Sequence, residues 1–379
     1  MRFAMISGMG RSGGSLLARL LDGHPEIASF PYEPRFGKIE PHKHNKLSER
    51  FPDPLTGSIE DVLRRNRRLE HCLSIVSGAR PSKNEFPDYD LEFFRKALRC
   101  PLPEEAKPGD FIEAYAEAFF RSHAYYRNRW NDISVVAWHS ARSQFWSEDL
   151  LNIEGLQLIY IVRHPLDVLA SYMRSKGRKV PITPEIELLC WCDCILRAAR
   201  DQECHPDRVT MVRYEDMVSD VDAFAHKLAR RLGIADTGEL RHPSLLGEAW
   251  TGNSSYQKYN AVSRDSIGRF ANFFSADQIS RCAEVLDGWL GPLGYSLEGP
   301  YFSEPVSLER IAAEKDPFAL TRDLLLYTES RFKRGLRDGD HEGFWPNPYA
   351  ERQKAGISTA IKKKARSLFA AADPKGQKT

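Results

Sequence analysis

The sequence lacks long apolar segments and any strong excess of one charge. No apolar run reaches the roughly 18 residues of a membrane-spanning helix, so the chain is not expected to cross a bilayer. Lys plus Arg number 54 and Asp plus Glu number 52, which leaves a formal net charge of +2 over 379 residues. So small a bias excludes a general polyanion-binding surface, and nucleic acid is not expected as a partner. Any anion site must be local.

Cysteine is scarce and irregularly spaced. Seven Cys residues, an odd number, make a poor disulfide framework. Cys190, Cys192 and Cys194 alternate in a segment of helical pattern, which places them on different helix faces, and no further Cys/His pair with zinc spacing follows. We expect buried, reduced thiols and no metal.

A buried strand that begins at Phe3 leaves no room for a signal peptide, so a cytoplasmic location is expected.

What the sequence does contain is a phosphate-binding pattern at its start. Residues 3–6 are an apolar run typical of a buried strand, residues 8–14 are rich in glycine, and Ser15 begins an apolar-periodic helix. A strand, glycine loop and helix can surround a phosphate with main-chain N–H groups and the positive end of a helix. Gly14 stands where a Walker lysine would be, which argues against an ordinary nucleoside triphosphate. Arg11 adds a guanidinium inside the loop, although a turn of this kind can also be only a tight corner.

Further apolar runs extend the pattern into an α/β fold. Residues 134–137, 156–162 and 209–212 are predicted strands, and the last two lead into helices near Leu166 and Asp222. Strands that alternate with helices predict a P-loop-like three-layer domain, in which helices flank a central parallel sheet. Ligands of such sheets bind at the carboxyl ends of the strands.

The main domain is expected over residues 1–300. Residues 36–130 combine proline, charge and short helical pieces, typical of a helical insertion that faces an acceptor. Residues 301–379 predict a C-terminal helical extension with a polar, basic tail. The basic run at 64–68 is either a solvated helix face or a contact for an anionic acceptor. The run at 361–369 is either a solvated tail or a peripheral contact with an anionic membrane.

A second anion site is predicted after the strand at residues 156–162. Arg163 follows this strand, and Ser171 lies in the second turn of the next helix, so both can face one phosphate. Because parallel strands end at one sheet edge, this site and the first loop can face the same ligand. A ligand with a 5′-anhydride and a separate 3′-phosphate would use both.

Three segments carry a family resemblance: GMGRSGGSLLARLLDGHPEI, YIVRHPLDVLASYMRS and VRYEDM. Together they resemble the sulfotransferases that use 3′-phosphoadenosine 5′-phosphosulfate (PAPS), and the resemblance extends over about residues 1–296. It implies a loop for the 5′-phosphosulfate, a 3′-phosphate site at Arg163 and Ser171, and Tyr214 near the nucleotide. The PAPS-binding residues so implied are Gly10, Arg11, Ser12, Gly13, Gly14, Ser15, Leu16, Arg163, Ser171 and Tyr214.

The resemblance implies in-line sulfuryl transfer to an acceptor hydroxyl, usually without a metal. A donor without a γ-phosphate does not need the Walker lysine. Transfer needs a base for the hydroxyl and positive charge near the sulfuryl and bridging oxygens. Arg11 and the loop N–H groups suit the second task. Glu33 is expected as the base, on a Glu-x-Arg comparable to that of tyrosylprotein-type members. Glu26 is a competitor, and a surface glutamate paired with Arg35 is the alternative for Glu33.

His139 stands near the place where many relatives have a lysine before the 3′-phosphate strand. If protonated, it could donate to the leaving-group oxygen and act as a catalytic residue. A structural histidine is the alternative.

Acceptor and reaction class leave several possibilities open. A carbohydrate or glycolipid hydroxyl is the expected acceptor, and an aryl or small alcohol is the alternative. A P-loop small-molecule kinase is a second possible function, which predicts a lysine at position 14 and an acidic strand end. A third is a non-catalytic protein that binds a nucleotide or glycan on the same fold.

Overall fold

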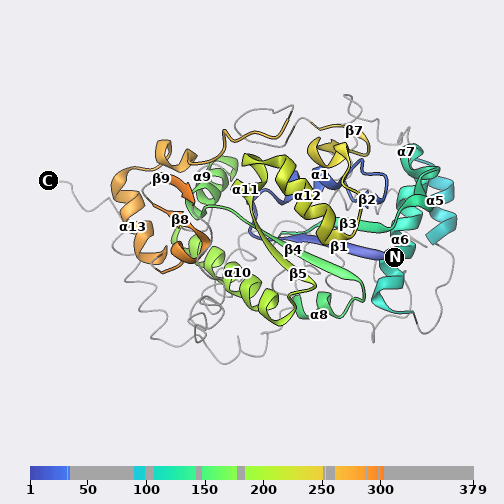
Figure 1. Ribbon diagram of the computed structural model, residues 1–379, viewed down its shortest axis with the longest axis horizontal. Coiled ribbons are helices and arrows are strands. Elements are labelled where there is room, and N and C mark those ends of the chain that lie inside the picture. The colour runs from blue at the N-terminus through green and yellow to red at the C-terminus, as the bar shows by residue number, and fades with distance from the viewer. Residues whose placement is uncertain are drawn as a thin grey trace, which may run out of the picture.

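The computed structural model (Figure 1) describes residues 1–31, 33–34, 89–98, 106–141, 147–176, 184–250, 252, 261–286, 288–297 and 299–302. Both basic runs, at 64–68 and 361–369, lie outside these residues, as does most of the predicted C-terminal extension.

A five-stranded parallel sheet forms the centre of the molecule, in the order β2-β3-β1-β4-β5. Its strands are β1 (Arg2–Ser7), β2 (Ile27–Ser29), β3 (Val135–His139), β4 (Leu156–Val162) and β5 (Val209–Arg213). β1 lies in the middle, where Ile6 is in register with His139 of β3 and with Ile159 of β4. The sheet and its flanking helices confirm the predicted α/β class.

Helices cover both faces of the sheet, with α1, α11 and α12 on one side and α6, α8 and α10 on the other (Figure 1). The described helices are α1 (Gly14–Leu21), α5 (Leu91–Leu98), α6 (Pro108–Ser122), α7 (Ala124–Arg127), α8 (Ser147–Leu151), α9 (Pro165–Lys176), α10 (Pro184–Cys204), α11 (Tyr214–Ser219), α12 (Val221–Leu232) and α13 (Ala276–Leu286). Because both faces are buried, the strands are apolar almost throughout rather than alternating.

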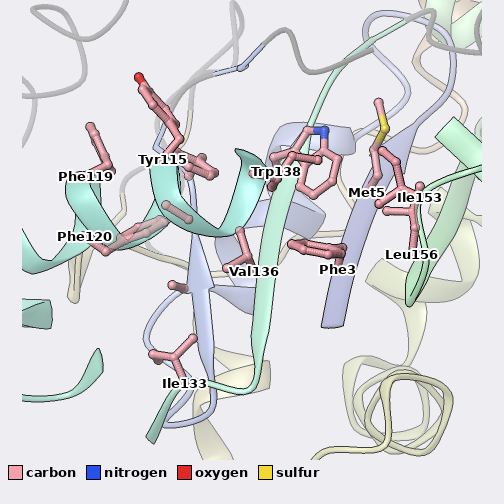
Figure 2. Packing of buried hydrophobic residues seen from close by; sticks show 14 of the residues in the cluster. Phe3, Met5, Tyr115, Phe119, Phe120, Ile133, Val136, Trp138, Ile153 and Leu156 are labelled. Atoms are coloured by element: carbon pink, nitrogen blue, oxygen red, sulfur yellow. The ribbon is translucent and has the colours of Figure 1, made fainter. Parts of the chain in front are cut away.

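Part of the predicted insertion belongs to the core. Phe3 of β1 and Val136 and Trp138 of β3 point toward α6 (Figure 2). Phe120 of α6 packs against Phe30 with ring centroids 4.8 Å apart. Truncating a buried phenylalanine of this kind costs about 3–5 kcal/mol. At its carboxyl-terminal end, therefore, the insertion covers the sheet.

The strand predictions agree closely with the structure. The strand at 156–162 is confirmed with the same ends, the one predicted at 134–137 runs from Val135 to His139, and the one at 209–212 continues to Arg213. β2 was not predicted, because three residues are too few to show a pattern. Between β5 and the helix predicted near Asp222 lies a further short helix, α11.

Of the predicted C-terminal extension, the structure describes only residues 301–302, and these lie in a strand. Tyr301 and Phe302 belong to strand β9 (Gly299–Phe302), which pairs antiparallel with β8 (Tyr295–Ser296). Among the residues described, none of the helices has both the length and the apolar character needed to cross a membrane.

The cysteine predictions hold for one cluster but not for every described thiol. Cys190, Cys192 and Cys194 are buried in α10 and Cys282 is buried in α13, whereas Cys204 at the end of α10 is exposed. Burial raises the pKa of the Cys192 thiol well above its usual range. Within the described ranges, no group of three or more His, Cys, Asp or Glu side chains is placed to hold a metal ion.

Candidate active site

A pocket lies at the carboxyl ends of β1, β3, β4 and β5. Its wall combines the glycine loop, the residues that follow these strands and a segment around residues 261–269. The lining residues are Arg11, Gly13, Gly14, Ser15, Leu16, His139, Arg163, Asp167, Ser171, Tyr214, Pro243, Trp250, Gly252, Ala261, Ser263, Ser266 and Arg269. Most of the predicted nucleotide-binding residues therefore share one pocket, as the common sheet edge requires.

Close backbone packing makes glycine necessary in the loop. Gly8 and Gly13 have φ angles of 132° and 101°. A Cβ at Gly8 would lie 2.3 Å from the carbonyl oxygen of Ile161, and one at Gly13 would lie 2.3 Å from the Tyr214 ring. The helix α1 begins after Gly13 without a side-chain cap, so its first N–H groups remain for a ligand or solvent.

Arg11 connects the two predicted anion sites. Its Nε donates a hydrogen bond to Oγ of Ser171 at 3.1 Å, and its carbonyl oxygen accepts one from Nη1 of Arg163 at 3.2 Å. Arg11 also has a φ of 73°, a left-handed conformation that costs a residue with a Cβ about 1–2 kcal/mol. Backbone strain in a binding loop is consistent with a functional constraint on that residue.

Arg163 lies at the centre of the site and is 7% exposed. Its guanidinium sits over the Tyr214 ring, with Cζ 4.5 Å from the ring centroid, and Nη2 donates to the carbonyl oxygen of Ser266 at 2.6 Å. Its Nε is buried and has no hydrogen-bond partner among the described residues. A buried donor without a partner costs about 1–3 kcal/mol unless a ligand supplies an acceptor.

A buried network holds the backbone on either side of Arg163. Trp191 Nε1 donates to the Arg163 carbonyl at 2.9 Å, and the His164 N–H donates to Glu215 at 2.9 Å. The Tyr295 hydroxyl donates to the other Glu215 oxygen at 2.7 Å. Burial raises the pKa of the Glu215 carboxyl and lowers the pKa of His164. The role of Glu215 in this network was not predicted from the sequence.

Asp167 of α9 holds the segment at residues 266–270, which forms part of the pocket wall. Its carboxylate accepts hydrogen bonds from the backbone N–H groups of Gly268 and Phe270, at 2.8 and 2.9 Å. Tyr214 and Ser266 are joined by a hydroxyl–hydroxyl contact of 2.5 Å. Asp167 and Ser266 were not predicted from the sequence. A capping carboxylate that acts 101 residues away along the chain leaves no local pattern.

Glu33 and His139 lie together beside the loop. Oε1 of Glu33 is 3.6 Å from Nδ1 of His139, and the two side chains are 33% and 13% exposed. The competitor Glu26 lies at the opposite end of the sheet, where its carboxylate accepts from the Ala235 N–H at 2.9 Å. Glu26 also precedes β2, whereas Glu33 follows it. The geometry therefore favours Glu33 over Glu26.

Gly10 and Ser12 were predicted to bind the nucleotide but lie outside the pocket wall. A Cβ at Gly10 would meet nothing within 4 Å, so this glycine is not required by packing. Ser12 is 1% exposed, and its Oγ is buried without a hydrogen-bond partner in the described part of the chain. Neither residue lines the described pocket.

The sequence model described as "Sulfotransferase family" matches residues 4–238, which include the glycine loop, Arg163 and Tyr214. No curated protein matches the chain significantly.

Solved structures similar to the chain include the sulfotransferase domain of the Synechococcus PCC 7002 olefin synthase. That domain is 21% identical, with 64% of this chain and 77% of that chain covered and a TM-score of 0.39. The sulfotransferase domain from the curacin biosynthetic pathway is 16% identical, with coverage of 75% and 97% and a TM-score of 0.42. The sulfotransferase STF9 from Mycobacterium avium is 13% identical, with coverage of 79% and 78% and a TM-score of 0.39.

Proposed function

Because the chain belongs to the sulfotransferase family and is therefore an enzyme, we propose that it transfers a sulfuryl group from PAPS to an acceptor hydroxyl, with a carbohydrate or glycolipid as the acceptor class. The observation that carries this proposal is the contact between Arg11 and Ser171, with Arg163 bonded to the Arg11 carbonyl. It joins a glycine loop to a second cationic site in one pocket, which suits a donor with two separate anionic ends.

The described residues fit PAPS in their chemistry. The loop N–H groups and the start of α1 would hold the 5′-phosphosulfate, while Arg163 and Ser171 would hold the 3′-phosphate. One buried polar atom of the pocket wall, Nε of Arg163, has no partner among the described residues and would gain one from such an anion. When bound, PAPS supplies an activated sulfuryl group on a phosphate leaving group.

Glu33 is the proposed general base. It is partly exposed and lies beside the loop, where an acceptor hydroxyl could approach it from solvent. Arg11 and the loop N–H groups would stabilise negative charge on the sulfuryl oxygens. The carbohydrate or glycolipid acceptor is proposed from the sequence, because residues 250–255, 268–270 and 293–295 resemble segments of the carbohydrate and tyrosylprotein branches of the family. A cytoplasmic location and a membrane contact through residues 361–369 stay predictions.

Radiolabelled PAPS provides the direct test. The purified chain is incubated with ³⁵S-PAPS and a panel of simple glycosides and glycolipids, and label is followed into the acceptor. Glu33→Gln should lower kcat by about 10²- to 10⁴-fold, the usual contribution of a general base. It should leave the affinity for the product 3′-phosphoadenosine 5′-phosphate (PAP) within a few-fold.

A kinase or a simple binding protein would behave differently. If ATP with magnesium raised the melting temperature more than PAP did, the kinase alternative would be favoured and the proposal rejected. Tight PAP binding without transfer to any acceptor would favour the non-catalytic alternative.

A further inference from the structure

The space that a side chain at position 14 would need is taken by an imidazole. A Cβ built on Gly14 would lie 2.2 Å from Nε2 and 2.5 Å from Cδ2 of His139. Real Cβ atoms essentially never approach a heavy atom more closely than 3.0 Å. A side chain at position 14 therefore requires the His139 ring to move from this position.

His139 is held from two directions. Its main chain ends β3, in register with Ile6, and the next residue continues the pairing because the Ser140 N–H donates to the Ile6 carbonyl at 2.9 Å. Its Nδ1 faces the Glu33 carboxylate at 3.6 Å, and its Nε2 is the atom nearest to the position of a residue 14 side chain. One ring nitrogen thus faces a carboxylate and the other faces the start of α1.

We propose that Glu33 and His139 act as a coupled pair, in which the His139 imidazolium provides the cation that a lysine supplies in other phosphate loops. This rests on the proposed function. In the transfer, the acceptor oxygen bonds to sulfur as the bond between sulfur and the 5′-phosphate oxygen breaks. Glu33 takes the hydroxyl proton, and His139 Nε2–H donates to the phosphate oxygen that keeps the electron pair.

The pairing explains why the two residues lie together. A carboxylate beside an imidazolium compensates its charge before the reaction. Once Glu33 has taken the acceptor proton it is neutral, so the His139 charge is no longer compensated when negative charge builds up on the leaving group. Deprotonation of the acceptor and stabilisation of the leaving group are then linked through one contact.

The first test needs no acceptor and uses PAP as the probe. PAP affinity is measured by calorimetry for the full chain and for His139→Gln. The ring ¹⁵N signals of His139, assigned by their loss in His139→Gln, are followed by NMR during the PAP titration. The expected result is PAP binding in both proteins, with a clear shift of the His139 signals in the wild type.

The second test uses substitutions at positions 139 and 14, singly and combined. His139→Gln and His139→Ala should lower kcat with ³⁵S-PAPS by about 10²- to 10³-fold, the usual cost of losing one such donor, with little change in melting temperature. Gly14→Lys alone collides with the ring and should lose both stability and activity. Gly14→Lys combined with His139→Ala removes the collision, returns a cation, and should exceed His139→Ala in kcat by at least tenfold.

The outcomes separate the two proposals. Failure of the wild-type chain to bind PAP would overturn the proposed function and this inference together. PAP binding with unmoved His139 signals, or wild-type kcat in His139→Gln, would overturn only the coupled pair. If the double variant does not fold, the NMR titration and the kcat of His139→Gln still decide whether the coupled pair exists.

Discussion

The Nε atom of Arg11 lies 3.1 Å from Oγ of Ser171, 160 residues further along the chain. This hydrogen bond joins the glycine loop after β1 to the helix α9 after β4. The two strands are neighbours in the sheet, so the residues that follow them meet at its carboxyl edge. Arg11 is thus in direct contact with the predicted 3′-phosphate site as well as with its own loop.

Two substitutions at Arg11 separate its charge from its backbone strain. Arg11→Ala and Arg11→Gly both remove the guanidinium, so both should weaken PAP binding by about tenfold or more, as expected for a lost charged hydrogen bond. Only glycine adopts a φ of 73° without strain, so Arg11→Gly should be more stable than Arg11→Ala by about 1 kcal/mol. Calorimetry and chemical denaturation measure the two effects. Equal stability of the two variants would mean that the loop relaxes when the arginine is removed.

The 3′-phosphate assignment can be tested by comparing two ligands. PAP and AMP differ only in the 3′-phosphate, so their affinity ratio measures the contribution of that site. Arg163→Gln and Ser171→Ala should lower this ratio, because Arg163 and Ser171 are the proposed ligands of the 3′-phosphate. Glu33→Gln is the matched control and should preserve it. A ratio unchanged in both Arg163→Gln and Ser171→Ala would place the 3′-phosphate elsewhere.

The sequence predicted the sheet better than it predicted the support of the site. Arg163 and Ser171 could be placed from the sequence, because a strongly apolar strand with clear ends precedes Arg163 and the next helix carries Ser171. Tyr214 was implied by the family resemblance. Glu215 and Asp167 could not be assigned their roles, because their partners lie far along the chain. The same holds for the pairing of Glu33 with His139, which depends on how β2 and β3 lie side by side.

Asp167 should control the order of the segment that carries Ser266. Its two oxygens accept the Gly268 and Phe270 N–H groups, and an Asp167→Asn amide can replace only one of these acceptors. The variant should lose about 1–3 kcal/mol of stability, because a backbone donor is left without its partner. Hydrogen exchange should quicken at residues 266–270 and should slow again when PAP is added. Unchanged exchange there would show that other contacts hold the segment.

The buried Glu215 carboxyl should make stability depend on pH. Its pKa is raised by burial, so the folded chain holds this proton more tightly than the unfolded chain does. Its stabilising contribution is therefore fully present below the ordinary value of 4.5, and it is lost as the pH rises through the raised pKa. Glu215→Gln cannot ionise and should flatten this fall in unfolding free energy at pH values above 4.5.

Tyr295→Phe should increase the pH dependence of stability that Glu215→Gln decreases. The Tyr295 hydroxyl donates to Glu215 at 2.7 Å, and this hydrogen bond lowers the pKa of Glu215. Without it, the pKa of Glu215 should rise further, so the loss of stability should extend to higher pH and become larger in total. Denaturation curves at several pH values measure both variants against the wild type. His164 contributes in the other direction, because its lowered pKa removes stability as the pH falls below 6.5. If Glu215→Gln and Tyr295→Phe changed the slope in the same direction, the pH dependence would have to come from other groups.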